Sequence, residues 1–186
     1  MNTILSKKEM SEEDIKLQYI TPAITSKWDR GKITMETQVT DGKINLKGNF
    51  VFREKPKRAD YILYLNANNP IAIIEAKDNK HSVSHGLQQA MTYGDGFVEH
   101  DFLTGKERQF GLDEFPTEAE LVARFKHESG MTPAQEMVIE QPYYSSQNTY
   151  PPRYYQRIAI NRTVDAIARG RNRLLLVMAT GTGKTY

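Results

Sequence analysis

The phosphate-binding loop near the end of the chain constrains the fold more than any other feature of the sequence. The segment MATGTGKT occupies residues 178–185 and follows residues 173–177, which are apolar from Leu174 on and which we expect to form a strand. In such a loop, backbone N–H groups cradle the phosphates, the lysine reaches the β- and γ-phosphates, and the last hydroxyl binds Mg²⁺. The residues that we expect to bind a nucleotide are Gly181, Thr182, Gly183, Lys184 and Thr185.

The composition indicates a globular chain without a membrane segment. A length of 186 residues suits one full domain and part of another, and a hydrophobic content of 39% is enough to form a core. No apolar stretch is long enough to cross a bilayer, and the first residues lack the apolar core of a secretory signal. The absence of cysteine excludes disulfides, cysteine-held zinc and thiol catalysis. It also agrees with a reducing compartment, so we expect a cytoplasmic protein.

The charge of the chain leaves its partners open. A formal net charge of +2 does not indicate a nucleic-acid partner by itself. Two local basic runs, residues 53–58 and 169–173, are either solvated surface or contacts to phosphates.

The first part of the chain predicts one helix and then a series of strands. Ser11 is placed as an N-cap, followed by acidic residues, and the helix is expected to end near Thr21 and Pro22. Residues 33–40 and 43–54 are expected to be strands, and the Asp41-Gly42 pair between them favours a hairpin. Further along, we predict a strand at residues 59–65, a turn at 66–70, a second strand at 70–77 and helices near 83–93 and 116–126.

The second part of the chain predicts a linker and then an amphipathic helix. Residues 129–152 are rich in proline and polar residues, which is typical of a linker. The following helix is expected to end at Gly170. Its inward-facing side chains should be Ile158, Val164, Ile167 and Ala168.

Charged residues at the end of the strand at 70–77 form a candidate catalytic group. This strand is apolar on both faces until Glu75, which suggests a strand covered on both sides. Glu75 and Lys77 lie two residues apart and therefore face the same way. Antiparallel pairing with the preceding strand would bring Asp60 level with Glu75.

Two carboxylates and a lysine in one small volume have two interpretations. Asp60 and Glu75 could hold Mg²⁺, which prefers carboxylate oxygens, and Lys77 could orient an attacking water or stabilise charge on a phosphodiester. The alternative is an ion pair of Lys77 with one of the acids, which would cap the end of the strand.

The order of these motifs resembles that of a known family. The sequences RADY at 58–61 and IIEAK at 73–77 resemble the PD-(D/E)xK nuclease core, and Gln89 and Tyr93 have the Q-x-x-x-Y spacing of one branch of it. Together with MATGTGKT, the chain from Ser11 onward resembles the N-terminal part of the restriction subunit of a type I restriction-modification enzyme. Helicase-type motors often relax the glycine position at which Met178 stands.

The resemblance implies further site residues. Glu12 on the first helix would join the catalytic site, with Glu13 as an alternative, although acids at this position also serve the helix dipole. Gln89 and Tyr93 would line the nuclease site or its DNA approach, or would be a surface glutamine and a core tyrosine. Gln156 would recognise the adenine of ATP, because its amide both donates and accepts hydrogen bonds, or it would be exposed at the start of a helix.

The fold that the resemblance implies is α/β. A PD-(D/E)xK endonuclease-like domain with a mixed sheet flanked by helices would occupy residues 1–128. A linker would follow at 129–152, and residues 153–186 would form the first helix and strand of a RecA-like ATPase domain. Family members usually carry a further strand after the Gln/Tyr helix, and the chain is about ten residues short there.

The implied activity is Mg²⁺-dependent cleavage of double-stranded DNA after ATP-driven translocation. The partners would be methyltransferase and specificity subunits. We expect a longer parent protein, and we expect no ATP hydrolysis by this chain alone, because it lacks the later motor motifs. Two alternatives are the nuclease-like domain of another DNA-dependent ATPase or helicase, and a catalytically silent domain that grips DNA or a partner.

Overall fold

The computed structural model divides the chain into two units, Met1–Gly130 and Met131–Tyr186. The division of the chain into three domains at 128 and 152 stays a prediction. The predicted helix at 83–93 lies outside the described residues. The structure describes residues 9–66, 69–76, 96–100, 104–143, 150 and 152–183.

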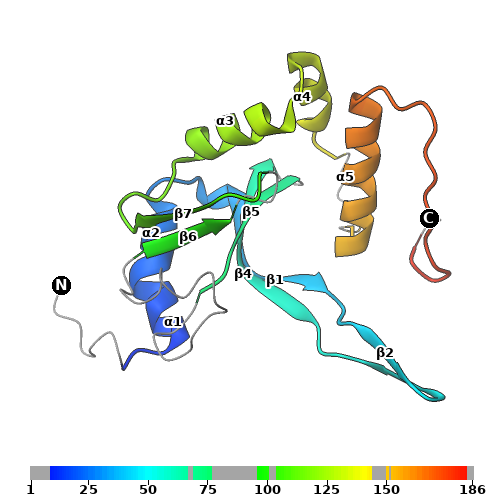
Figure 1. Cartoon of the computed structure of the whole chain (residues 1–186), viewed down its shortest axis with the longest axis horizontal. Coiled ribbons are helices and arrows are strands. Elements are labelled where there is room, and N and C mark those ends of the chain that lie inside the picture. Colours follow the sequence, from blue (N-terminus) through cyan, green and yellow to red (C-terminus); the bar gives the residue numbers. More distant parts are fainter. Residues whose placement is uncertain are drawn as a thin grey trace. The chain divides into compact units, whose positions relative to one another are not determined.

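The centre of the first unit is a strand that is buried on both faces. Strand β4 (Lys57–Asn66) pairs antiparallel with β1 (Ile33–Thr40) on one side and with β5 (Asn69–Ile74) on the other (Figure 1). Its residues are buried without interruption from Ala59 to Leu65. The predicted antiparallel pairing of the strands at 59–65 and 70–77 is confirmed, although the second strand ends at Ile74.

Two predictions about the sheet differ from the structure. The expectation that residues 70–77 form a strand covered on both faces is wrong, because Ile73 is 54% exposed and β5 lies at an edge of the described three-stranded sheet. All strand pairs among the described residues are antiparallel, so the expected mixed sheet is not found there. The α/β character is confirmed.

The N-terminal helix is longer than predicted. It begins at the predicted cap Ser11 with α1 (Glu12–Ile15) and continues as a π-helical turn, η1 (Lys16–Ile20), into α2 (Thr21–Thr25). The prediction that it ends at Pro22 is wrong. Proline cannot donate an i→i−4 hydrogen bond and its ring crowds that carbonyl, and the wider π turn directly before α2 accommodates both effects.

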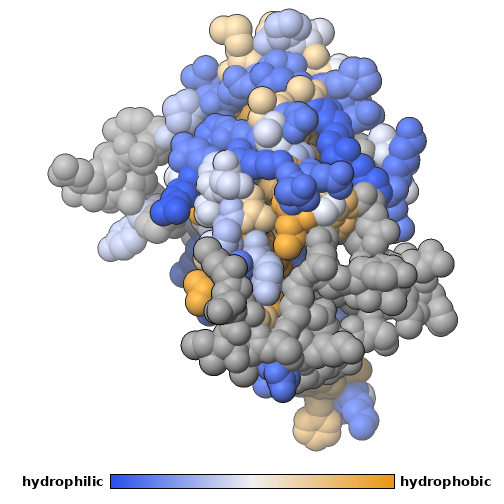
Figure 2. All heavy atoms as spheres, turned by 90° about the vertical axis from the view of Figure 1, so that its left-hand side faces the viewer, coloured by the Kyte–Doolittle hydropathy of each residue, from blue (hydrophilic) through white to orange (hydrophobic). Residues whose placement is uncertain are grey.

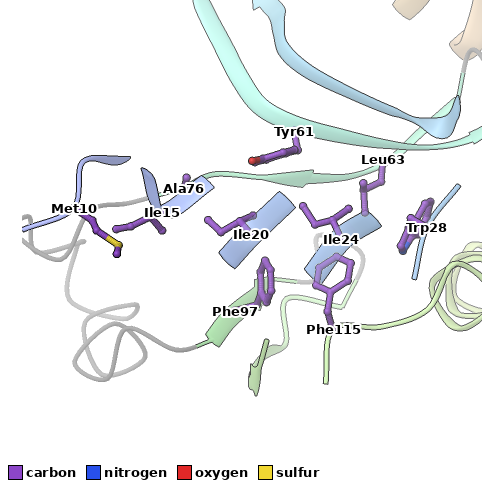
Figure 3. Close-up of a cluster of buried hydrophobic side chains, with 10 residues drawn as sticks. All are labelled: Met10, Ile15, Ile20, Ile24, Trp28, Tyr61, Leu63, Ala76, Phe97 and Phe115. Atoms are coloured by element: carbon purple, nitrogen blue, oxygen red, sulfur yellow. The ribbon is translucent and has the colours of Figure 1, made fainter. Parts of the chain in front are cut away.

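The helix lies between two layers of strands and supplies the middle of the core. Its side chains Ile15, Ile20 and Ile24 project between Tyr61 and Leu63 of β4 on one side and Phe97 and Phe115 on the other (Figure 3). Trp28, directly after the helix, is 3% exposed, and its indole N–H donates to the Pro116 carbonyl. The core therefore joins segments that are distant in the sequence.

A separate hairpin extends from the sheet. Strands β2 (Ile44–Lys47) and β3 (Phe50–Arg53) pair with each other and project beyond the β1–β4 pair (Figure 1). The predicted hairpin between 33–40 and 43–54 through Asp41 and Gly42 is therefore wrong. The tight turn lies at Gly48 and Asn49, where Gly48 has a φ of 60°, and β1 pairs with β4 instead.

The first unit is completed by a second hairpin and two helices. Strands β6 (Gly96–His100) and β7 (Glu107–Gly111) form an antiparallel pair. A short 3₁₀ helix, η2 (Arg30–Lys32), leads into β1, and α3 (Glu118–Ser129) matches the helix predicted near 116–126. Hydrophilic residues cover most of the upper part of the face seen in Figure 2, and hydrophobic residues show in its middle.

The regular structure in the described part of the second unit is helical. It contains α4 (Pro133–Ile139), inside the segment expected to be a linker, and α5 (Tyr154–Ala168), as predicted. The prediction that Ile158 and Ile167 face inward is wrong, because they are 48% and 53% exposed. None of the described helices is long and apolar enough to cross a membrane.

The predicted strand at 173–177 is not formed. Leu175 and Val177 are 90% and 83% exposed, and the described residues 171–179 have no regular structure. A strand exists only where neighbouring backbone groups satisfy its N–H and C=O groups, and the described part of this unit offers no such neighbour.

A buried and an exposed position should lose very different amounts of stability when their side chains are shortened. Leu63 is fully buried and Phe50 is 78% exposed. We expect Leu63→Ala to lower the free energy of unfolding by about 2–5 kcal/mol, and Phe50→Ser to change it by less than about 0.5 kcal/mol. Urea unfolding followed by the fluorescence of Trp28, the only tryptophan, measures both. Equal losses for the two variants would contradict this core.

Candidate functional site

The buried carboxylate of Asp60 organises the candidate site. Asp60 lies on the central strand β4 and is 8% exposed. A charge taken out of water requires partners. The Asp60 carboxylate has two that are close: Oδ1 accepts from the Lys16 ammonium at 2.5 Å, and Oδ2 accepts from the backbone N–H of Ala76 at 2.6 Å.

The strand register brings acids from both neighbouring strands toward Asp60. Tyr61 pairs with Met35 of β1 and with Ile74 of β5. One step along both ladders, Asp60 lies between Glu36 and Glu75, the latter just beyond the end of β5. Side chains of directly opposed residues share one face of a sheet. The prediction that Asp60 lies opposite Glu75 agrees with this register. The Glu75 side chain is exposed.

The Lys16 ammonium lies among three carboxylates. Besides Asp60, it contacts Oε1 of Glu36 at 3.0 Å and Oε1 of Glu12 at 3.4 Å. Burial alone would lower the pKa of the Lys16 amine, but the hydrogen bonds and charges of Asp60 and Glu36 outweigh it and raise the pKa above its usual value. Lys16 is therefore a protonated cation inside an acidic cluster.

Glu36 has an unusual backbone conformation. Its φ is 50°, and among the described residues it is the one non-glycine residue with a positive φ. The strand pairs on either side of it keep the same register. A non-glycine residue in this region costs about 1–3 kcal/mol of strain, and such residues are found most often at functional sites.

The structure distinguishes the acids of the first helix. Glu12 reaches Lys16 as an i,i+4 pair, whereas Glu13 is exposed and Asp14 closes a capping box with Ser11. Glu12 is thus the helix acid that approaches Asp60 through a shared partner.

The remaining predicted residues of this site lie outside the described residues. These are Lys77, Gln89 and Tyr93, so their roles stay predictions. Sequence reasoning missed Lys16 and Glu36. A signal for Lys16 existed, because it lies four residues before Ile20 and eight before Ile24 on the apolar side of the helix, and four residues after Glu12. The sequence held no comparable signal for Glu36.

The donor set of this cluster fits a hard divalent cation in its chemistry. Mg²⁺ prefers carboxylate oxygens, and Glu12, Glu36 and Asp60 supply only such oxygens. Among the described residues, however, no three acidic or histidine side chains are arranged to hold a metal ion. The Lys16 ammonium takes the central position in the cluster.

The second candidate site is the phosphate-binding loop. Its glycines Gly181 and Gly183 have φ values of 78° and 69°, conformations that favour glycine. The Gln156 amide nitrogen donates to the carbonyls of Thr182, at 3.0 Å, and Gly183, at 3.2 Å. A Cβ on Gly183 would lie 2.9 Å from this nitrogen. The helix and the loop are thus in direct contact.

Gln156 has a structural use in this arrangement. Its amide oxygen accepts from the backbone N–H of Arg153 at 2.8 Å and so caps the start of α5. Its proposed role toward adenine stays a prediction, as do the roles of Lys184 and Thr185, which lie outside the described residues.

Comparisons with known proteins cover nearly the whole chain. Residues 35–131 match the family described as "Type I restriction enzyme EcoKI endonuclease subunit second domain", and residues 149–186 match "Type III restriction enzyme, res subunit". The endonuclease subunit of the type I restriction enzyme EcoAI from Escherichia coli is 41% identical over 201 residues, which covers 98% of this chain and 25% of the relative. The chain thus spans about a quarter of the relative's length.

A solved structure supports the same family. A fragment assigned to an HsdR subunit of a type I restriction enzyme from Vibrio vulnificus YJ016 has a TM-score of 0.71 and 36% sequence identity, and the match covers 95% of this chain and 36% of that one. Both family matches and both relatives are subunits of restriction enzymes. Because the type I family model matches more than half of the chain, the chain belongs to the endonuclease subunits of type I restriction enzymes. The resemblance to the restriction subunit of a type I enzyme is confirmed.

The buried pairing of Asp60 predicts a large difference between two identical substitutions. Asp60→Asn removes the charge that holds Lys16, and we expect it to lower the free energy of unfolding by about 1.5–3 kcal/mol, as for hydrogen bonds to charged groups. Asp113→Asn, at an exposed position, should change it by less than about 0.5 kcal/mol. Urea unfolding of the two variants tests this, and an unchanged Asp60→Asn would exclude the buried ion pair.

Proposed function

We propose that the first unit supplies the DNA-cleaving site of a type I restriction enzyme. In this proposal, Asp60 and Glu75 hold Mg²⁺, Lys77 acts on the phosphodiester, and Glu12 completes the site. The observation that carries the proposal is the register that sets a buried Asp60 between Glu36 and Glu75, with its carboxylate fixed by the Ala76 N–H.

The chemistry follows from the residue types. Bound Mg²⁺ would supply a water activated for attack and would neutralise charge on the phosphate. The chain's own part is positioning: the Ala76 N–H holds one Asp60 oxygen. Lys77 follows Glu75 by two residues in the sequence and would face the same way in an extended segment. The Lys77 ammonium would offset the negative charge that develops on phosphorus as water attacks and the P–O bond to the leaving sugar oxygen breaks.

We further propose that residues 178–185 begin the ATP site of a motor that moves DNA toward this nuclease. The supporting geometry is the pair of left-handed glycines and the contact of Gln156 with the loop. Gln89 and Tyr93 would line the approach of double-stranded DNA. Translocation, site recognition and methylation would require the longer parent together with methyltransferase and specificity subunits.

Two variants of the assembled full-length enzyme should fail in different ways. Lys77→Ala should lower DNA cleavage by about a hundredfold or more, the range for loss of one group that stabilises transition-state charge, and should leave ATP turnover unchanged. Lys184→Ala should abolish ATP turnover, because the phosphates lose their lysine.

Each variant is the control for the other, and Lys106→Ala, at an exposed position of the first unit, is a control for loss of a lysine. Cleavage and ATP hydrolysis are measured on the same plasmid. Normal cleavage by Lys77→Ala would refute the nuclease assignment and favour a domain that only grips DNA. Continued ATP turnover by Lys184→Ala would refute the assignment of the loop.

A further inference from the structure

Lys16 has more acidic partners than its own charge requires. Its ammonium contacts carboxylates from three separate elements: Glu12 of α1, Glu36 of β1 and Asp60 of β4. One positive charge therefore faces three negative charges, so the cluster keeps a net negative charge that still attracts cations.

The side chain of Lys16 occupies the oxygen of Asp60 that a divalent cation would need. Asp60 Oδ2 is taken by the Ala76 N–H, and Oδ1 by the Lys16 ammonium. Each carboxylate oxygen can accept more than one partner, but the ammonium 2.5 Å from Oδ1 repels a divalent cation that approaches the same oxygen. A lysine can move because its ammonium ends a flexible four-carbon stem.

Two backbone features coincide at the same place. The π-helical turn begins at Lys16, and π turns are found frequently at functional sites. Opposite it, Glu36 has the strained positive φ and remains half exposed, with 53% of its side chain accessible. Glu36 is thus a second acceptor for Lys16 that lies outside the buried part of the site.

We propose that Lys16 is the internal counter-ion of the nuclease site, bound to Asp60 until a divalent cation replaces it, and that Glu36 then holds the displaced ammonium. This inference rests on the proposed function, because it takes Asp60 as a metal ligand. It makes Lys16 and Glu36 positioning residues that set the metal affinity without contact with the DNA.

The test measures metal binding in the absence of DNA and ATP. Mn²⁺ is titrated calorimetrically into the 186-residue chain and its variants. Lys16→Met removes the competitor and should tighten Mn²⁺ binding by about tenfold or more, within the usual range of coupling between two ligands. Lys32→Met, which removes a lysine that pairs with Glu118 on the same unit, should bind Mn²⁺ like the wild type.

A double-mutant cycle tests the role of Glu36. Glu36→Gln should weaken Mn²⁺ binding in the wild type, where the displaced Lys16 loses its acceptor, and should have no effect in the Lys16→Met background. An equal effect in both backgrounds would overturn the role of Glu36 as acceptor and would make it a direct ligand. Unchanged or weaker Mn²⁺ binding by Lys16→Met would overturn the competition itself.

Other outcomes remain decisive. If Lys16→Met is unfolded without metal, Mn²⁺ must restore the fluorescence of the buried Trp28, and failure to do so at a concentration that saturates the wild type overturns the proposal. The nuclease function is judged separately. If Lys16→Met binds Mn²⁺ more tightly but the assembled wild-type enzyme does not cleave DNA, the competition between Lys16 and the metal stands and the proposed nuclease function is refuted.

A different observation carries a second inference. The projecting segment at residues 41–58, which we call the arm, holds the β2–β3 hairpin. Its basic residues outnumber its acidic residues and are all exposed: Lys43, Lys47, Arg53, Lys55, Lys57 and Arg58 against Asp41 and Glu54. Its large apolar side chains are exposed as well: Ile44, Leu46, Phe50, Val51 and Phe52.

We infer that the arm binds the backbone and a groove of double-stranded DNA. A two-stranded β-ribbon fits the major groove of B-DNA, where apolar side chains contact thymine methyl groups, and the lysines and arginines would contact phosphates. The dense positive charge favours DNA over an apolar protein surface, because burying unpaired lysines against protein would be costly. The inference deepens the proposed function, because it names the element that holds the substrate.

Binding of a 25-base-pair duplex, measured by fluorescence anisotropy in EDTA at several salt concentrations, tests the arm. Lys47→Gln with Lys55→Gln should weaken binding about tenfold and reduce the salt slope by about 2. The matched pair Arg30→Gln with Lys106→Gln, exposed outside the arm, should have much smaller effects. Equal effects of the two pairs would overturn the inference and point to a protein partner, whereas the nuclease assignment depends on cleavage alone.

Discussion

The ion pair between Asp60 and Lys16 is the interaction on which the first unit depends. Asp60 interrupts a strand whose neighbours are apolar and buried, so its carboxylate needs a cation in place of water. The partner comes from 44 residues earlier in the chain. Such pairs add little net stability over apolar residues, but removing one partner is costly. The pair therefore fixes which part of the helix packs against which part of β4.

The same helix forms the core and supplies the site. Ile15, Ile20 and Ile24 face the apolar layer, and Lys16 reaches the sheet from the same segment because the π turn changes the angular spacing of the side chains after Ile15. Glu12, one turn earlier, then meets the ammonium. A shift of the helix relative to Asp60 would therefore also disturb the packing of Ile20 against β4.

Local patterns of the sequence predicted the parts of the fold that depend on near neighbours. The turn at 66–70 and the apolar flanks determined the β4–β5 hairpin, and hence the level of Asp60 with Glu75, because a short antiparallel connection leaves few registers. The contacts of Lys16 with Asp60 and Glu36 join residues 44 and 20 positions apart. Local spacing places Lys16 on the apolar side of the helix, but it does not encode contacts with residues so distant, which is why neither Lys16 nor Glu36 was among the predicted site residues.

The failed predictions share a physical cause. The Asp41-Gly42 pair has the chemistry of a hairpin turn, and Gly42 is required there, because a Cβ would lie 1.9 Å from the Glu54 carbonyl. Yet β1 pairs with β4, because this pairing buries the apolar side chains of β4. Residues 173–177 failed for want of a neighbour: they have the apolar pattern of a strand, but no described strand lies beside them. A strand forms only where a neighbouring segment pairs with its backbone and covers its apolar side chains. An apolar pattern alone therefore does not determine whether a segment becomes a strand.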